Sequence, residues 1–282
     1  MSNDVFTLVE PDQRSAGIIV NSPHSGRDYA DTFIASSQLS LRDLRSSEDA
    51  YVDLLFDAAP KLGLPLLSAK FPRAFVDLNR ASDELDPALI HGVPSRSLNP
   101  RVSSGLGVIP RVVAEGKEIR SGKMMLQTAE ARLSRFYWPY HQQLTDMMSA
   151  TRAQFGTALL LDCHSMPSMS GAADPIKYDI VLGDRFGASC SGLMMDHVEA
   201  AFAEAGFKTG RNAPFAGAYM AQRYGNPSRG LNVIQIEINR RLYLNEERIE
   251  LSPNYSMVKQ RLTQVLSDIV QYLGPEVGLA AE

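Results

Sequence analysis

Apolar residues in this chain fall into two patterns that alternate along the sequence. Short unbroken apolar runs are typical of strands buried on both faces, and apolar positions repeated at i, i+3 and i+4 indicate helices. The short runs predict strands at residues 17–20, 64–69, 74–78, 158–163, 178–182 and 233–238. The helical spacing predicts helices at residues 39–62, 126–155, 188–205 and 253–273. Because strands alternate with helices, we expect a layered α/β domain with a largely parallel sheet.

The segments outside this pattern do not divide the chain into separate domains. Residues 1–15 are polar and are expected to form a loosely attached lead-in. Residues 86–122 are rich in Pro, Gly and Ser and have little periodicity, which is typical of a functional loop near a site. No boundary resembles an interdomain linker, so residues 1–282 are predicted to form a single catalytic domain.

Composition excludes several classes of protein. A net charge of −4 without a basic block argues against a nucleic-acid partner. No apolar run approaches the ~20 residues that a membrane span requires. The N-terminus does not resemble a signal peptide, and the two cysteines form no disulfide framework, so a cytoplasmic location is expected. The oligomeric state stays open.

Two of the predicted strands end in residues that can carry chemistry. The run over 158–163 leads into Asp162-Cys163-His164-Ser165, and the run over 17–20 leads into a loop with His24 and Ser25. Open α/β sheets bind their ligands beyond the carboxyl ends of the strands. The two His-Ser pairs therefore predict one site.

Acidic and basic residues elsewhere complete a candidate set. Asp49 lies on the apolar side of its predicted helix next to Glu48, and Glu237 lies in a buried run. Two imidazoles, one carboxylate and an open position form a catalytic zinc site, and a further carboxylate can activate water. The arginines Arg73, Arg80 and Arg240 can hold anionic groups of a substrate.

Structural roles compete with these assignments. A histidine at a strand end can be a hydrogen-bonded structural residue, and Asp49 can be satisfied by an arginine instead of a metal. Glu237 is harder to explain in this way, because a buried Glu needs a partner. His141, beside the apolar stripe of its helix, is a weaker candidate for a metal ligand.

Cys163 is not expected to be a nucleophile. It directly precedes His164, so the two side chains point to opposite faces of a strand, and a buried, inert thiol is predicted. Asp162 and Ser165 are candidates for orienting the metal ligands.

An ordered set of short segments resembles the N-formylglutamate amidohydrolase family from about residue 16 to 250. The segments are Ser22-Pro23-His24-Ser25-Gly26, Asp49-Ala50-Tyr51-Val52-Asp53, Val76-Asp77-Leu78-Asn79-Arg80, Asp162-Cys163-His164-Ser165 and Gln235-Ile236-Glu237. That family resembles the zinc carboxypeptidases, which implies a three-layer α/β sandwich with a mixed, mainly parallel sheet between helices.

The resemblance also implies a role for each candidate residue. His24 and His164 would be Zn²⁺ ligands, with Asp49 as the third ligand and Glu48 as its alternative. Carboxypeptidases usually take the acidic ligand from the third position after the first histidine, where this chain has Arg27. Glu237 would be the general base. Asn79 and Arg80 would bind a substrate carboxylate, and Arg73 and Arg240 are further candidates for this role.

The implied activity is zinc-dependent hydrolysis of an N-formyl or N-acyl amino acid. The substrate would be a small anionic amino-acid derivative, N-formyl-L-glutamate, split into formate and glutamate during histidine breakdown. Arg240 and Arg241 stand where some members carry uncharged residues, so the acyl group and the amino acid stay open. The alternatives are a carboxypeptidase-like or other N-acyl-amino-acid hydrolase, and a metal- or ligand-binding protein without catalysis.

Overall fold

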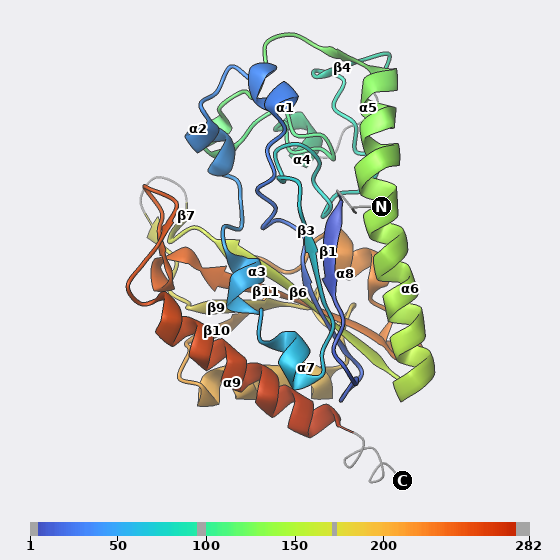
Figure 1. Ribbon diagram of the computed structural model, residues 1–282, viewed down its shortest axis with the longest axis vertical. Coiled ribbons are helices and arrows are strands. Elements are labelled where there is room, and N and C mark those ends of the chain that lie inside the picture. Colours follow the sequence, from blue (N-terminus) through green and yellow to red (C-terminus); the bar gives the residue numbers. More distant parts are fainter. Residues whose placement is uncertain (1–4, 95–99, 171–173, 275–282) are drawn as a thin grey trace. The chain divides into compact units, whose positions relative to one another are not determined.

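The computed structural model describes residues 5–94, 100–170 and 174–274, and the chain folds into two compact units (Figure 1). Unit 1 comprises Met1–Thr7, Pro23–Ala50 and Ala69–Gln143. Unit 2 comprises Leu8–Ser22, Tyr51–Ser68 and Leu144–Glu282. Each unit is therefore assembled from segments that are distant in the sequence.

A mixed sheet forms the centre of unit 2. Within the described residues it has seven strands in the order β1-β3-β2-β6-β11-β9-β10. Their bounds are β1 (Phe6–Val9), β2 (Ile18–Ser22), β3 (Leu66–Ala69), β6 (Ala158–Met166), β9 (Ile180–Gly183), β10 (Thr209–Arg211) and β11 (Leu231–Asn239). The pairs β2/β3, β2/β6, β6/β11 and β9/β10 are parallel, and β9/β11 is antiparallel. The predicted α/β class with a mixed, mainly parallel sheet is confirmed.

The central strands are longer than their apolar runs. All nine residues of β6 are buried, and β11 is buried except for half-buried Leu231. The two strands pair in register from Leu231↔Ala158 to Asn239↔Met166. Both strands therefore carry polar residues, including His164 and Glu237, within the buried sheet instead of beyond its end.

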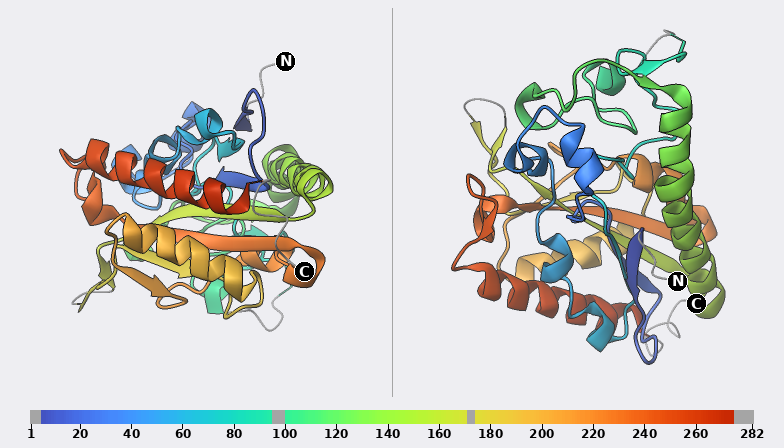
Figure 2. Two further views of the ribbon diagram at one scale, coloured as in Figure 1. Left: turned by 90° about the horizontal axis from the view of Figure 1, so that it is seen from below. Right: turned by 45° about the horizontal axis from the view of Figure 1, so that its top comes forward.

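The helices of unit 2 include one long amphipathic helix. The helical elements are α3 (Val52–Leu55), η1 (Ala59–Leu62), α7 (Gly192–Glu204), α8 (Tyr219–Tyr224), η4 (Pro227–Arg229), η5 (Arg240–Leu242) and α9 (Tyr255–Leu273). The buried face of α9 carries Val258, Leu262, Val265, Leu266 and Ile269, which is the i, i+3, i+4 spacing of a packed helix. This helix contacts α3, η1 and α7, and it lies beside α7 in both Figures 1 and 2. Short two-stranded ribbons complete the unit: β7 (Met169–Ser170) with β8 (Asp174–Pro175), and β12 (Leu244–Asn245) with β13 (Glu250–Leu251).

Unit 1 consists mainly of short elements. These are α1 (Asp31–Ala35), α2 (Leu41–Arg45), β4 (Ile90–His91), α4 (Pro100–Ser103), η2 (Ala114–Gly116), β5 (Met124–Met125), α5 (Leu126–Arg132) and a π-helical turn, η3 (Leu133–Tyr137). The turn continues into α6 (Trp138–Phe155), which belongs to unit 2 from Leu144 onward. The predicted helix over 126–155 is thus confirmed. Its π turn ends two residues before Pro139, which has no N–H to donate to the preceding turn.

The predicted continuous helix over 39–62 is wrong. Only α2, α3 and η1 form there, because residues between them make contacts that a helix forbids. The Asp49 N–H donates to the carbonyl of His24 at 3.0 Å, and Tyr51 has a left-handed backbone with φ of 63°. Contacts with a distant segment therefore override the local periodicity.

The predicted strand over 74–78 is also wrong. Val76 and Leu78 are fully buried, which explains the apolar run. Their backbone nevertheless turns, since the Phe75 N–H donates to the carbonyl of Pro72 at 2.9 Å. The Asp77 N–H donates to the carbonyl of Val108 at 2.8 Å. A residue of the irregular 86–122 stretch therefore accepts the hydrogen bond that a neighbouring strand would accept in a sheet.

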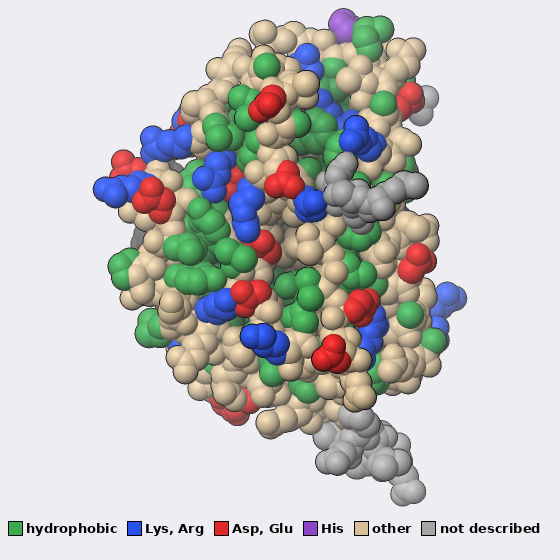
Figure 3. All heavy atoms as spheres, viewed as in Figure 1, with side chains coloured by type: hydrophobic (Ala, Val, Ile, Leu, Met, Phe, Trp, Pro, Cys, Tyr) green, Lys and Arg blue, Asp and Glu red, His purple; other side chains and the backbone are tan. Residues whose placement is uncertain are grey.

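Two surface features complete the description. Among the described residues, each helix is either too short or too polar to cross a membrane. On the face shown in Figure 3, basic and acidic side chains are interspersed.

Candidate active site

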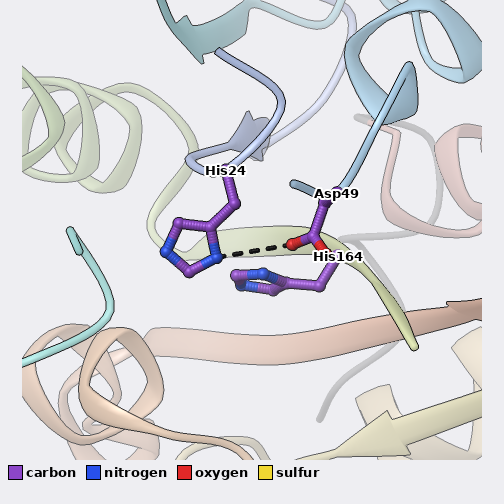
Figure 4. A group of neighbouring side chains, drawn as sticks. All are labelled: His24, Asp49 and His164. Atoms are coloured by element: carbon purple, nitrogen blue, oxygen red, sulfur yellow. Dashed lines mark ion pairs between the residues drawn. The ribbon is translucent and has the colours of Figure 1, made fainter. Parts of the chain in front are cut away.

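His24 is the centre of a buried polar network in unit 1. It lies two residues beyond the end of β2, and its side chain is fully buried. The imidazole Nδ1 lies 3.4 Å from Asp49 Oδ2, an ion pair drawn in Figure 4, and Nε2 lies 2.8 Å from Asp77 Oδ1. One histidine therefore lies between two buried carboxylates.

Asp77 is held as a carboxylate by its neighbours. Its Oδ2 accepts from Arg73 Nε at 2.9 Å, and its Oδ1 accepts from the Asn79 N–H at 2.8 Å. Burial alone would raise the pKa of Asp77, but the charges of Arg73 and Arg80 hold that pKa well below its usual value. An ionised Asp77 accepts a hydrogen bond from the N–H at Nε2 of His24. In a neutral imidazole the lone pair is then on Nδ1, the nitrogen that faces Asp49.

Asp77 was not assigned a role from the sequence, although it lies inside the Val76–Arg80 segment. Its distance of 53 residues from His24 left no local sign of the contact. The available signal was an acidic residue in a run that is otherwise apolar, since a buried carboxylate needs a partner.

Glu48 has different partners from Asp49. Its carboxylate accepts from Arg45 Nε at 3.0 Å and from the Tyr29 hydroxyl at 2.7 Å. Burial raises the pKa of Glu48. Of the two neighbouring acids, Asp49 is the one that forms the ion pair with His24.

His164 repeats this arrangement in unit 2. Its Nε2 lies 2.9 Å from Asp162 Oδ2, and Asp162 Oδ1 accepts from Asn21 Nδ2 at 2.7 Å. All three residues are buried. Asp162 thus makes the contact that an orienting role requires, and the second histidine is also backed by a carboxylate through Nε2.

Glu237 is the register partner of His164 on the neighbouring strand, β11. Register partners on adjacent strands project from the same face of a sheet, so the two side chains share that face. Gln235 Nε2 donates to Glu237 Oε1 at 2.8 Å, and Gln235 Oε1 in turn accepts from the Ala218 N–H at 3.0 Å. These two hydrogen bonds fix the orientation of the Glu237 carboxylate. Its oxygens can still accept hydrogen bonds or a proton.

The donor chemistry of three buried residues fits a metal ion. His24, Asp49 and His164 are buried, and each offers one atom that can bind a metal ion. Two imidazoles and one carboxylate form the protein ligand set of several catalytic zinc sites, with a position left for water or substrate. The strand that precedes His24, β2, is the parallel neighbour of β6, which carries His164.

The predicted substrate-binding residues have contacts in both units. In unit 1, the buried Arg80 donates through Nε to the carbonyl of Leu106 at 2.9 Å and through a terminal nitrogen to the carbonyl of Asn79 at 2.7 Å. In unit 2, Arg240 Nε donates to Ser165 Oγ at 3.0 Å. Ser165 thus contacts a candidate substrate-binding arginine, whereas its predicted role in orienting the metal ligands stays a prediction.

His141 has a structural environment. Its ring is fully buried, its Nε2 lies 3.1 Å from the carbonyl of Leu78, and its centroid lies 4.1 Å from that of Tyr137. These contacts account for the residue without a metal.

Both cysteines are expected to be inert in the folded protein. Cys163 is buried in β6 between two residues of the opposite face, and burial raises its pKa well above the usual value. Burial also raises the pKa of Cys190 to about 12. At pH 8 both thiols stay protonated and inaccessible.

We expect a chromogenic disulfide reagent to label neither Cys163 nor Cys190 in the native protein and to label both in denaturant. Rapid labelling of the native protein would contradict the buried positions of the two thiols.

Comparison with known proteins identifies the family. The sequence model of the N-formylglutamate amidohydrolase family matches residues 16–244, a range that includes every site residue described above. The chain belongs to this family.

Two curated members are named N-formylglutamate deformylase. The protein from Pseudomonas aeruginosa is 30% identical over 236 residues, which is 82% of this chain and 83% of that protein. The protein from Pseudomonas putida is 28% identical over 258 residues, which is 88% of this chain and 91% of that protein.

A solved structure of the family has the same fold. The N-formylglutamate amidohydrolase from Ralstonia eutropha JMP134 superposes with a TM-score of 0.88 at 32% identity. The match covers 96% of this chain and 98% of that one. Family membership therefore extends over almost the whole chain.

Proposed function

We propose that this protein hydrolyses N-formyl-L-glutamate to formate and L-glutamate. The family match and the names of the relatives support this substrate. The observation that carries the proposal is the pairing of His164 with Glu237 on one face of the sheet. This pairing puts a histidine that can bind a metal ion beside a buried carboxylate that can act as a general base. A single catalytic domain and a place in histidine breakdown stay part of the proposal.

We propose His24, Asp49 and His164 as the ligands of one Zn²⁺. Each imidazole has a carboxylate on Nε2, an arrangement that fixes the tautomer and raises ligand basicity. Glu48 is not proposed, because Arg45 and Tyr29 bind its carboxylate. When bound, zinc would polarise the amide carbonyl and lower the pKa of a water molecule toward ~7.

Glu237 is proposed to move the proton. Its carboxylate accepts a proton from the attacking water as the oxygen bonds to the formyl carbon, and then gives it to the amide nitrogen as the C–N bond breaks. Gln235 holds one carboxylate oxygen, which fixes the direction of transfer. The products are formate and the free amino group of glutamate.

Asn79, Arg80, Arg73 and Arg240 are proposed to bind the substrate carboxylates. A guanidinium carries five N–H donors. Arg73 and Arg240 use Nε to bind Asp77 and Ser165, so their other N–H groups can bind a substrate carboxylate. N-formylglutamate carries two carboxylates, and several arginines suit such a dianion. This pairing distinguishes the proposed substrate from acylated neutral amino acids.

Parallel assays would test the substrate. Zinc-loaded protein is given N-formyl-L-glutamate, N-acetyl-L-glutamate, N-formyl-L-alanine and a Gly-Glu dipeptide, and product release is followed by formate detection and amine detection. We expect the highest kcat/KM on N-formyl-L-glutamate. A higher kcat/KM on the dipeptide would favour a carboxypeptidase-like enzyme, and tight zinc binding without turnover of any compound would favour a binding protein.

Replacing Asp77 with Asn tests the support of His24. The amide no longer offers an ionised acceptor to Nε2, so the preferred tautomer of His24 is lost and zinc affinity should fall roughly 10- to 100-fold. Competition with a chromogenic chelator measures the affinity. Asp83→Asn, a change at an exposed acid of the same unit, is the matched control and should keep wild-type affinity. If Asp77→Asn bound zinc as tightly as Asp83→Asn and the wild type, Asp77 would not support the zinc ligand His24.

A further inference from the structure

Unit 1 contains an aromatic pocket outside the proposed metal centre. Tyr29, Phe33, Phe71, Phe75 and Phe136 line a cavity of about 370 Å³. Their rings follow one another, with centroid separations of 6.2 Å for Tyr29–Phe33, 5.1 Å for Phe33–Phe75, and 5.2 Å for both Phe75–Phe136 and Phe136–Phe71. A cavity of this size with aromatic walls suits a flat apolar ring.

A second cavity of about 400 Å³ adjoins the first and shares Phe33, Phe75, Phe136 and Arg135 with it. Arg120 and Arg132 also line this second cavity, and none of its described lining residues is acidic. The two cavities together form what we call the aromatic pocket. The first cavity has aromatic walls with Asp28, Lys70 and Arg135 also among its lining residues, whereas the charged residues that line the second cavity are all arginines.

The arginines of the pocket have unusual surroundings. Within the described part of the chain, neither Arg120 nor Arg132 forms an ion pair, and the buried Nε of Arg120 has no hydrogen-bond acceptor. Arg132 lies over the ring of Phe75, with its guanidinium carbon 3.9 Å from the ring centroid, and donates to the carbonyl of Phe75 at 3.2 Å. Burial, together with the charge of Arg120, lowers the pKa of Arg132 to about 10.

Holding two guanidinium groups together without an acid costs free energy unless an anion compensates them. A guanidinium stacked on an aromatic face still presents its N–H edge, which matches the geometry of a carboxylate. We propose that the aromatic pocket is a second binding site, for a small aromatic carboxylate whose ring contacts Phe33, Phe75 and Phe136 and whose anionic group binds Arg120 and Arg132. The proposal does not depend on the hydrolytic function.

The pocket adjoins residues that reach toward the proposed metal ligands. Tyr29, which lines the cavity, donates its hydroxyl to Glu48, the neighbour of Asp49. The segment Phe71–Phe75 contributes rings to the pocket and carries Arg73, the partner of Asp77. The pocket segments are thus one contact away from the two acids that meet His24, through Arg73 to Asp77 and through Tyr29 to the neighbour of Asp49.

Calorimetry with 2-naphthoate tests the proposal on the zinc-loaded full chain. We expect one site per chain, with binding at least about tenfold weaker for the neutral analogue 2-naphthalenemethanol and for acetate, which has no ring. Arg120→Gln and Arg132→Gln should each weaken 2-naphthoate binding about tenfold, the loss expected for one charge-assisted contact. Arg152→Gln, at an exposed position on α6 outside the pocket, should leave the affinity unchanged.

Arg120→Gln should not unfold the protein, because its guanidinium has no ion pair among the described residues. A thermal melt of each variant checks this point. Equal affinity of wild type and both pocket variants would overturn the proposal, as would equal affinity for 2-naphthalenemethanol. Loss of binding in Arg80→Gln with full binding in Arg120→Gln would also overturn it, since it would place the probe at the substrate-binding residues instead.

Discussion

Replacing Glu237 with Gln should lower kcat for formate release by about 10³-fold, within the range of general acid–base catalysis. Glutamine keeps an oxygen that can accept from Gln235 Nε2, so the hydrogen bond and the β11 register are preserved. It cannot take a proton from water at neutral pH. The variant removes the proposed proton transfer and leaves the structure in place.

The measurement is steady-state formate release together with zinc content and KM. Zinc content should stay at the wild-type level, because Glu237 is not a proposed ligand, and KM should change much less than kcat. Glu250→Gln, at an exposed position on β13, is the matched control and should keep full activity. Full activity of Glu237→Gln would exclude Glu237 as the base, whatever the substrate.

Removing the metal should have an effect of similar or greater size. A metal ion contributes several kcal/mol of stabilisation to the transition state, which corresponds to a loss on the order of 10³-fold or more when it is absent. We expect dialysis against a strong chelator to abolish formate release and added Zn²⁺ to restore it. His164→Ala should bind zinc weakly and should not regain activity at the zinc concentration that restores the wild type.

His91→Ala provides the control for this second experiment. His91 is exposed on β4 and is not among the proposed ligands, so its variant should bind one zinc per chain and keep its activity. Zinc content measured by elemental analysis separates the two variants. One tightly bound zinc in His164→Ala, or full activity after chelation, would contradict the proposed ligand set.

Part of the site could be predicted because its signals are local. An apolar run followed by His164, and another followed by His24, predict strand ends near a ligand. His24 does lie beyond the end of β2, whereas His164 lies inside β6, which continues to Met166. Alternation along a strand separates Cys163 from His164 without any tertiary information. The buried thiol of Cys163, with its raised pKa, agrees with that argument.

Other features could not be predicted, because their causes lie far away in the chain. The helix expected over 39–62 is broken where Asp49 bonds to the backbone of His24 and Tyr51 adopts a left-handed conformation. The apolar run over 74–78 reports burial correctly, but burial alone does not distinguish a strand from a buried turn. The bond from the Phe75 N–H to the carbonyl of Pro72 makes the backbone turn, and the Asp77 N–H finds its acceptor in the distant Val108.

The sequence by itself determined the α/β class, the central strands and the residue types that can hold a metal, since periodicity and strand-end composition are local properties of the chain. Only the tertiary structure decided which acid each histidine meets. Asp77 is brought against His24 from 53 positions away, whereas Asp162 meets His164 from two positions away. The aromatic pocket also arises only on folding, because its rings and arginines come from separated segments that apolar burial brings together.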